Sequence, residues 1–126
     1  MNEIHKIPKF YIDLIDQVFE VEKKLYSIEE SNSINRNILR MKEIFENIFS
    51  TSSETDVGLS YHNPIGESYS DTRTDLEASI AGSSIENLVV KEVVKPIIRY
   101  RKGSLTMIAR KGVVVVEAKN DEHLKQ

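Results

Sequence analysis

The spacing of apolar residues changes abruptly near Ser50. Before it, apolar side chains recur every three or four residues, as on one face of an α-helix. After it, they alternate or run together, as in short β-strands. In a chain of 126 residues this division predicts an α+β fold. Residues 1–50 are expected to form an antiparallel helical hairpin, and residues 51–126 a small all-β domain.

Two helices are expected in the first half. Pro8 suits the first turn of one, and Ser31 or Ser33 can cap the other. Their apolar stripes are too broad for one hairpin to cover, so we expect two copies to form a four-helix bundle. The alternative is that the stripes pack on the β-domain of the same chain. The residues expected to mediate dimerisation are Leu14, Val18, Val21, Leu25, Ile34, Ile38, Met41, Phe45 and Ile48.

Glycine-containing turns separate short apolar segments in the second half, which predicts a compact β-sandwich or small barrel. The clearest strand ends at Pro96, because proline cannot donate a hydrogen bond to a ladder. In that strand Val90 and Val94 are expected on one face and Val93 on the other. Gly66 and the acidic residues after it are expected in turns. The expected strands span residues 57–61, 88–94, 97–101, 105–109 and 113–117.

Composition excludes several classes of function. Cysteine is absent, which removes disulfides, thiolate catalysis and cysteine-based zinc sites. The net charge of −3 argues against general nucleic-acid binding. No segment approaches the roughly 20 apolar residues that cross a bilayer, so no membrane partner is expected. Residues 1–6 lack the apolar core of a signal peptide, which predicts a cytoplasmic protein.

An acidic cluster follows the first expected strand. Glu67, Asp71, Asp75 and Glu77 lie within it, and His62 precedes them. Such residues can hold a metal ion or act as a carboxylate pair, and a small metal-dependent enzyme is one hypothesis. Their spacing matches no metal-loop pattern, however, so a solvated loop is expected. No catalytic residue, metal or cofactor is therefore predicted, and an enzyme is not expected.

The late strands are locally basic. This charge could face nucleic acid, but stacking aromatics are sparse there, and an acidic protein surface matches the chain better. The charges could also simply keep edge strands soluble. The basic residues are Lys91, Lys95, Arg99, Arg101, Lys102, Arg110 and Lys111.

Four short motifs occur in order along the chain. Leu14-Ile15-Asp16 lies in the first expected helix, and Val57-Gly58-Leu59 follows the second. Next comes Pro64-Ile65-Gly66-Glu67-Ser68-Tyr69, and Arg110-Lys111-Gly112-Val113-Val114-Val115-Val116 leads into the last strand. Over about residues 8–117 this order resembles the GrpE nucleotide-exchange factors of DnaK-type chaperones. That family has two bundle helices, a Gly-Val-Glu-like turn, a Pro-x-Gly-Glu-x-Phe-Asp segment and an Arg-Pro-Ala-x-Val-x-Val strand.

The resemblance implies that the β-domain binds the nucleotide-binding domain of a DnaK-type ATPase and promotes ADP release. It implies partner contacts at Gly58, Arg110 and Val116, to which charge adds Arg99 and Arg101. The chain departs from the family in having no counterpart of its long N-terminal helix and in its altered turns. The alternative is therefore a noncatalytic adaptor that binds a divergent chaperone-like ATPase without exchange activity.

Overall fold

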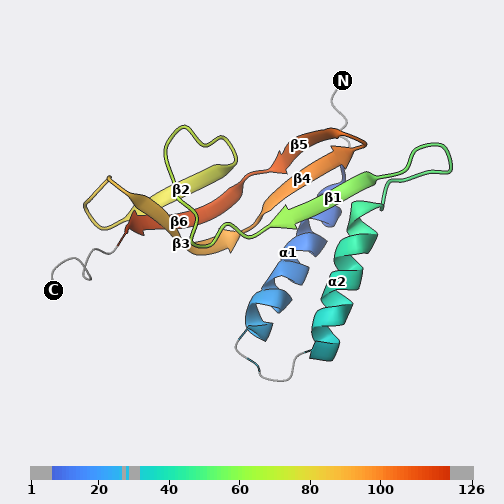
Figure 1. Ribbon diagram of the computed structural model, residues 1–126, viewed down its shortest axis with the longest axis horizontal. Helices are drawn as coiled ribbons and strands as arrows, with labels where there is room; N and C mark the ends of the chain where they lie inside the picture. The colour runs from blue at the N-terminus through green and yellow to red at the C-terminus, as the bar shows by residue number, and fades with distance from the viewer. Residues whose placement is uncertain (1–6, 27, 29–31, 120–126) are drawn as a thin grey trace. The chain divides into compact units, whose positions relative to one another are not determined.

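The computed structural model describes residues 7–26, 28 and 32–119, which form two helices and six strands (Figure 1). The α+β class is confirmed, and so are the helices and five of the six strands, to within a few residues. The elements are α1 Lys9–Leu25, α2 Asn32–Glu46, β1 Val57–His62, β2 Leu76–Ala81, β3 Leu88–Lys95, β4 Ile97–Lys102, β5 Leu105–Arg110 and β6 Gly112–Ala118.

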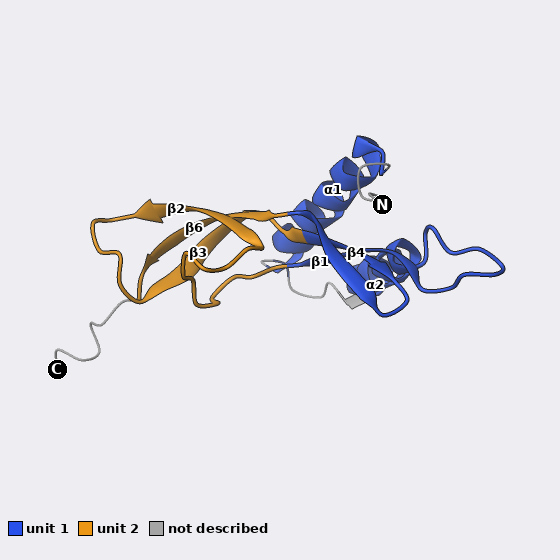
Figure 2. Cartoon of the chain, turned by 90° about the horizontal axis from the view of Figure 1, so that it is seen from above, with its two compact units in different colours: residues 1–62, 98–110 blue, residues 63–97, 111–126 orange. Residues whose placement is uncertain are grey.

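The chain divides into two compact units (Figure 2). Residues 1–62 and 98–110 make the first unit, which contains both helices and a sheet of order β1–β4–β5. Residues 63–97 and 111–126 make the second, which contains a sheet of order β2–β6–β3. The division therefore differs from the expected boundary at residue 50, and the six strands form two separate three-stranded sheets. The physical reason is that one sheet covers the apolar side of the helices.

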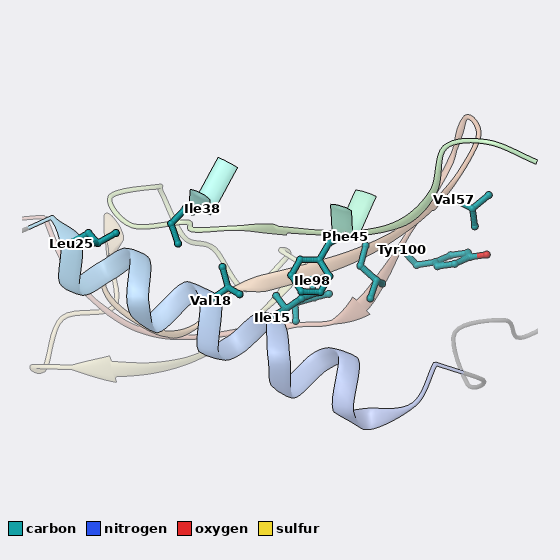
Figure 3. Close-up of a cluster of buried hydrophobic side chains, with 9 residues drawn as sticks. Ile15, Val18, Leu25, Ile38, Phe45, Val57, Ile98 and Tyr100 are labelled. Carbon is teal, nitrogen blue, oxygen red and sulfur yellow. The ribbon is translucent and has the colours of Figure 1, made fainter. Parts of the chain in front are cut away.

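In the first unit α1 and α2 run antiparallel and share a core with the sheet (Figure 1). Figure 3 shows how their side chains meet those of β1 and β4. The alternative in which the helical stripes pack on strands of the same chain therefore holds for their buried part. Four of the residues expected to mediate dimerisation are buried in this core and cannot contact a second copy. They are Val18, Leu25, Ile38 and Phe45.

The helix ends follow from local sequence. Pro8 has an extended backbone and precedes the first residue of α1, where its missing N–H leaves no donor unpaired. At the other end the Tyr26 N–H is shared between the carbonyls of Lys23 and Lys24. Ser33 lies inside α2 and so is not its cap, and Ser31 lies outside the described residues. Neither described helix is long and apolar enough to cross a membrane.

In the second unit β6 is the central strand, parallel to β2 and antiparallel to β3. Two register shifts interrupt the β3–β6 ladder, and each reverses the alternation of side chains. Val93 is therefore buried with Val90 while Val94 is exposed, so the predicted face of Val93 and Val94 was wrong. The shifts could not be predicted, because an uninterrupted valine-rich strand has the same sequence pattern.

The segment that follows β1 was expected to contain only turns, but part of it runs along the outer edge of β3. The Gly66 N–H donates to the Val90 carbonyl at 2.9 Å, and the Val90 N–H donates to the Glu67 carbonyl at 2.9 Å. The Tyr69 N–H donates to the Leu88 carbonyl at 2.9 Å. Gly66 adopts a φ of +81°, which suits the turn that begins this pairing. These bonds cover one edge of the sheet.

Candidate protein-interaction site

The residues predicted to contact a partner are distributed over both units. Gly58, Arg99, Arg101 and Arg110 belong to the sheet of the first unit, and Val116 belongs to the second. Val116 is fully buried in β6, and Gly58 is buried in β1. Neither is accessible to a partner in this structure, so both act in packing. Of the predicted contact residues, this leaves Arg99, Arg101 and Arg110 as candidates for a binding surface.

At Gly58 the backbone of β1 lies close to the backbone of α2. A Cβ placed on it would lie 2.2 Å from the Phe45 carbonyl oxygen and 2.4 Å from the Glu46 carbonyl carbon and oxygen. The chain is held nearby by the Phe49 N–H, which donates to the Val57 carbonyl at 2.9 Å. Because the obstructing atoms are backbone atoms, no side-chain rotation can make room. Only glycine fits at this junction between helix and strand.

Arg110 forms a bidentate ion pair with Asp16 of α1. Its Nη1 lies 2.9 Å from Oδ2 and its Nη2 lies 2.8 Å from Oδ1 of that carboxylate. The side chains of Arg110 and Asp16 are only 22% and 17% exposed, so the pair is largely withdrawn from water. A paired guanidinium in this geometry positions α1 against the end of β5. The main role of Arg110 in this structure is therefore to hold α1 in place through Asp16.

Arg99 and Arg101 lie on β4. Arg99 is between the buried Ile98 and Tyr100, and Arg101 follows Tyr100. Arg99 is half-buried opposite Ile108, whereas Arg101 is exposed and its Nε donates to the Gly103 carbonyl at 2.9 Å. Since strand residues alternate between faces, these arginines lie on the side of the sheet away from the helices. They are the predicted contact residues that a partner can reach.

The basic character of the late strands is smaller than their sequence indicates. Lys91 pairs with Glu117, and Lys102 lies 3.5 Å from Glu54. With Arg110 bound to Asp16, three of the seven basic residues are thus neutralised by acids of the same chain. Lys95 and Lys111 belong to the second unit, whereas Arg99 and Arg101 belong to the first. Two arginines of one strand suit a localised contact with an acidic protein group better than the backbone of a nucleic acid.

A second polar network joins three elements of the first unit. The Tyr61 hydroxyl donates to Oε1 of Glu22 at 2.8 Å, and Lys42 donates to Oε2 at 3.0 Å. The Lys42 ammonium also lies 4.9 Å from the centre of the Tyr61 ring. Burial, followed by the hydrogen bond to Glu22, raises the pKa of Tyr61 well above its usual value near 10. The phenol therefore remains a donor, and the network links α1, α2 and β1.

Sequence reasoning missed the role of Glu22. The residue stood beside the apolar stripe of the first helix, and an acid on the flank of such a stripe is a usable indication of a buried partner. The partner itself could not be found, because Tyr61 is 39 residues away. Such pairs depend on how helix and sheet pack.

The acidic cluster is organised around Arg73, a residue that the sequence did not single out. Its Nε and Nη2 both donate to Asp75 at 3.0 Å, and its Nη1 donates to Glu67 at 3.1 Å and to the Ser68 carbonyl at 3.0 Å. Chiefly through the hydrogen bonds to Asp75, the pKa of Arg73 is raised above its ordinary value. Two of the four acids are thus bound by a cation of the chain. Within the described residues no group of three acidic or histidine side chains is placed to hold a metal ion.

Replacing Arg73 with methionine is expected to lower the free energy of unfolding by about 1–2 kcal/mol, because two carboxylates lose their shared donor. Protection of the Gly66 and Tyr69 amides from hydrogen exchange should fall with it. Urea unfolding and exchange measured by NMR test this. Arg36→Met, an exposed arginine of α2, is the matched control and should change neither quantity. Equal effects of both variants would contradict the role assigned to Arg73.

The hairpin exposes apolar side chains that the sheet does not cover. We call the set Phe10, Leu14, Val21, Ile34 and Ile44 the hairpin stripe, and its members are 44–63% exposed. On α1 the members recur at spacings of four and seven residues, which places them on one helical face. Met41 and Ile48, also expected to mediate dimerisation, are partly buried against the core. On α1 the members of the hairpin stripe therefore form an exposed apolar face.

Comparison of the chain with protein-family models, with curated proteins and with solved structures found no match.

Proposed function

We propose that this protein is a GrpE-like co-chaperone that promotes ADP release from a DnaK-type chaperone ATPase by binding its nucleotide-binding domain. One observation carries the proposal. Asp16 and Arg110 belong to two of the motifs that resemble the family, stand 94 residues apart and form the bidentate pair described above. Gly58, in a third motif, occupies a junction that excludes any side chain. Residues that give the resemblance thus hold a common scaffold together.

The mechanism requires binding energy and no covalent chemistry. A protein that binds the ATPase more tightly when its cleft is open shifts the domain toward that state. ADP, which is held by the closed cleft, then binds more weakly by the same coupling free energy. Coupling of this kind typically changes an affinity by about 5- to 150-fold. The contact surface consists of Arg99 and Arg101. The buried Gly58 and Val116 pack inside their sheets, and the partly buried Arg110 holds α1 against β5.

Dimerisation through the hairpin stripe is part of the proposal. With four residues of the original set inside the core, the second copy would cover Leu14, Val21 and Ile34 together with Phe10 and Ile44. Two hairpins with such faces can make a four-helix bundle. Each copy then presents the Arg99 and Arg101 side chains of its β4 to a chaperone.

Leu14→Glu is expected to convert the dimer into a monomer, because it places a charge in the centre of an apolar contact. The substitution should raise the dissociation constant of the dimer at least about tenfold. Sedimentation equilibrium at micromolar concentration measures this constant. Leu39→Glu is the matched control, since Leu39 is an exposed leucine of α2 outside the hairpin stripe, and it should remain dimeric. A wild-type chain that is monomeric, or a dimer indifferent to Leu14→Glu, would contradict this part of the proposal.

The affinity of the chain for the DnaK-type ATPase of its own organism separates exchange from the adaptor alternative. Calorimetry on the nucleotide-free and ADP-loaded ATPase should give binding at least about fivefold tighter without ADP, as reciprocity requires. Arg101→Glu should weaken both, and Arg36→Glu, with the same change of charge on α2, should weaken neither. Equal affinity with and without ADP would favour the adaptor, and absence of any complex would overturn both readings.

A further inference from the structure

The outer edge of β2 carries backbone groups without a partner strand. The Gly112 N–H donates to the Asp75 carbonyl at 3.0 Å, and in a parallel ladder only alternate residues face the neighbouring strand. The N–H and C=O groups of Leu76, Ala78 and Ile80 therefore point away from β6. Among the described residues of the second unit, no backbone hydrogen bond is found to these outward groups. The edge therefore carries a row of outward donors and acceptors, of which Leu76 is buried, Ala78 is partly exposed and Ile80 is exposed.

β2 also has little of the usual protection of an edge strand, since Glu77 is the one charged residue in it. Its sequence contains no lysine or proline, and its register with β6 runs without a shift from Leu76 to Ala81. The opposite edge of the same sheet is different, because residues 66–69 cover β3 with hydrogen bonds and β3 is interrupted by bulges. A regular, unguarded edge is the template on which an extended peptide adds as a strand.

A hollow lies over one face of this sheet, where residues of β2 and β3 line it together. Ala78 and Ile80 of β2 form one wall, and Tyr69, Ile85 and Leu88 form the rest of its apolar lining. Ile85 is 75% exposed and Ile80 is half-exposed, so the apolar surface is open to an incoming side chain. Because side chains of a strand alternate between faces, every second residue of an added strand would face the same side as Ala78 and Ile80. Apolar side chains at alternate positions of an added strand would therefore extend the apolar face that begins with Ala78 and Ile80.

The charge around the edge favours a basic ligand. Asp71 lines the hollow, and Glu77 is exposed on β2 itself. The nearest cation of the segment, Arg73, is committed to Asp75 and Glu67. Asp71 and Glu77 therefore favour a ligand that carries positive charge.

We propose that the outer edge of β2 binds an extended polypeptide segment with alternating apolar side chains and flanking basic residues, which adds to the sheet as a fourth strand. The site lies in the second unit and requires neither nucleotide nor the chaperone ATPase. It is therefore independent of the function proposed above, and the two can fail separately.

A fluorescein-labelled peptide, Lys-Thr-Val-Thr-Leu-Thr-Arg, tests the proposal by fluorescence anisotropy with the full chain. N-methylation of one alternate set of its backbone amides removes the donors that face β2 and should weaken binding at least about tenfold. Methylation of the other set, which faces solvent, should change it less than about twofold. Replacing the two basic residues by glutamate should also weaken binding. No binding of the parent peptide, or equal effects of the two methylated sets, would overturn the proposal.

Variants of the chain complete the test. Ala78→Pro removes an outward N–H without touching the ladder to β6, and Ile80→Asp places a charge in the hollow. Both should weaken peptide binding at least about tenfold, whereas Val94→Asp, an exposed valine of β3, should not. If Ala78→Pro does not fold, Ile80→Asp against Val94→Asp decides alone. Unchanged binding by Ile80→Asp overturns the proposal, and so does a dimer that Ala78→Pro dissociates while no peptide binds, since a second copy would then occupy the edge.

Discussion

Replacing Gly58 with alanine should lower the free energy of unfolding by at least about 3 kcal/mol, because the added methyl group cannot be accommodated. It would lie 2.2 Å from the Phe45 carbonyl oxygen and 2.4 Å from backbone atoms of Glu46. Relief requires α2 to move away from β1, which opens the core that Phe45 and Leu59 share. Urea unfolding followed by circular dichroism measures the loss.

Gly82→Ala is the matched control for this substitution. Gly82 has a φ of +86°, and a methyl group added there would meet no other atom within 4 Å, so only backbone strain opposes it. That strain costs about 1 kcal/mol. If Gly58→Ala lowered the free energy of unfolding by no more than Gly82→Ala does, the inferred close contact between α2 and β1 would be contradicted. Loss of chaperone binding by Gly58→Ala would then point to a direct contact instead.

Arg110→Ala should lower the free energy of unfolding by about 2–3 kcal/mol, because it strands the carboxylate of Asp16 in a site that is largely withdrawn from water. The control is Lys9→Ala, which breaks the pair between Lys9 and Asp13 on the exposed side of α1. That pair is solvated, so its loss should cost less than about 0.5 kcal/mol. Chemical unfolding of the two variants side by side measures the difference.

The same pair separates scaffolding from partner contact. If Arg110 acts only by positioning α1, Asp16→Ala should weaken chaperone binding as much as Arg110→Ala does, and the double variant should add little. If Arg110→Ala weakens binding while Asp16→Ala leaves it intact, Arg110 touches the partner and its scaffold role is secondary. Calorimetric titration of the three variants distinguishes these outcomes.

Periodicity predicted most of the secondary structure because it reports which face of an element is covered. It missed β2, where Glu77 and Ser79 alternate with the small Ala78 and leave only Leu76 and Ile80 as apolar indications. It also predicted one β-domain where there are two sheets. The pattern of a strand does not reveal which strands it joins, and β1 pairs with β4, which begins 35 residues after β1 ends.

The candidate site was less predictable than the fold. A broad helical stripe is compatible both with a second copy and with a sheet of the same chain, and the structure divides the stripe between a buried and an exposed part. The pairs that organise the polar groups join residues far apart in sequence, as Asp16 and Arg110 do. Arg99 and Arg101 were predicted as contact residues from their charge alone. They are the predicted contact residues that lie on the face of β4 away from the core.

The rate at which a fluorescent ADP analogue leaves the DnaK-type ATPase of the same organism tests the proposed function most directly. In a stopped-flow chase with excess unlabelled nucleotide, we expect a release rate that rises with the concentration of this protein and saturates at least about fivefold above the intrinsic rate. A release rate that stays at the intrinsic value while a complex forms would contradict exchange activity.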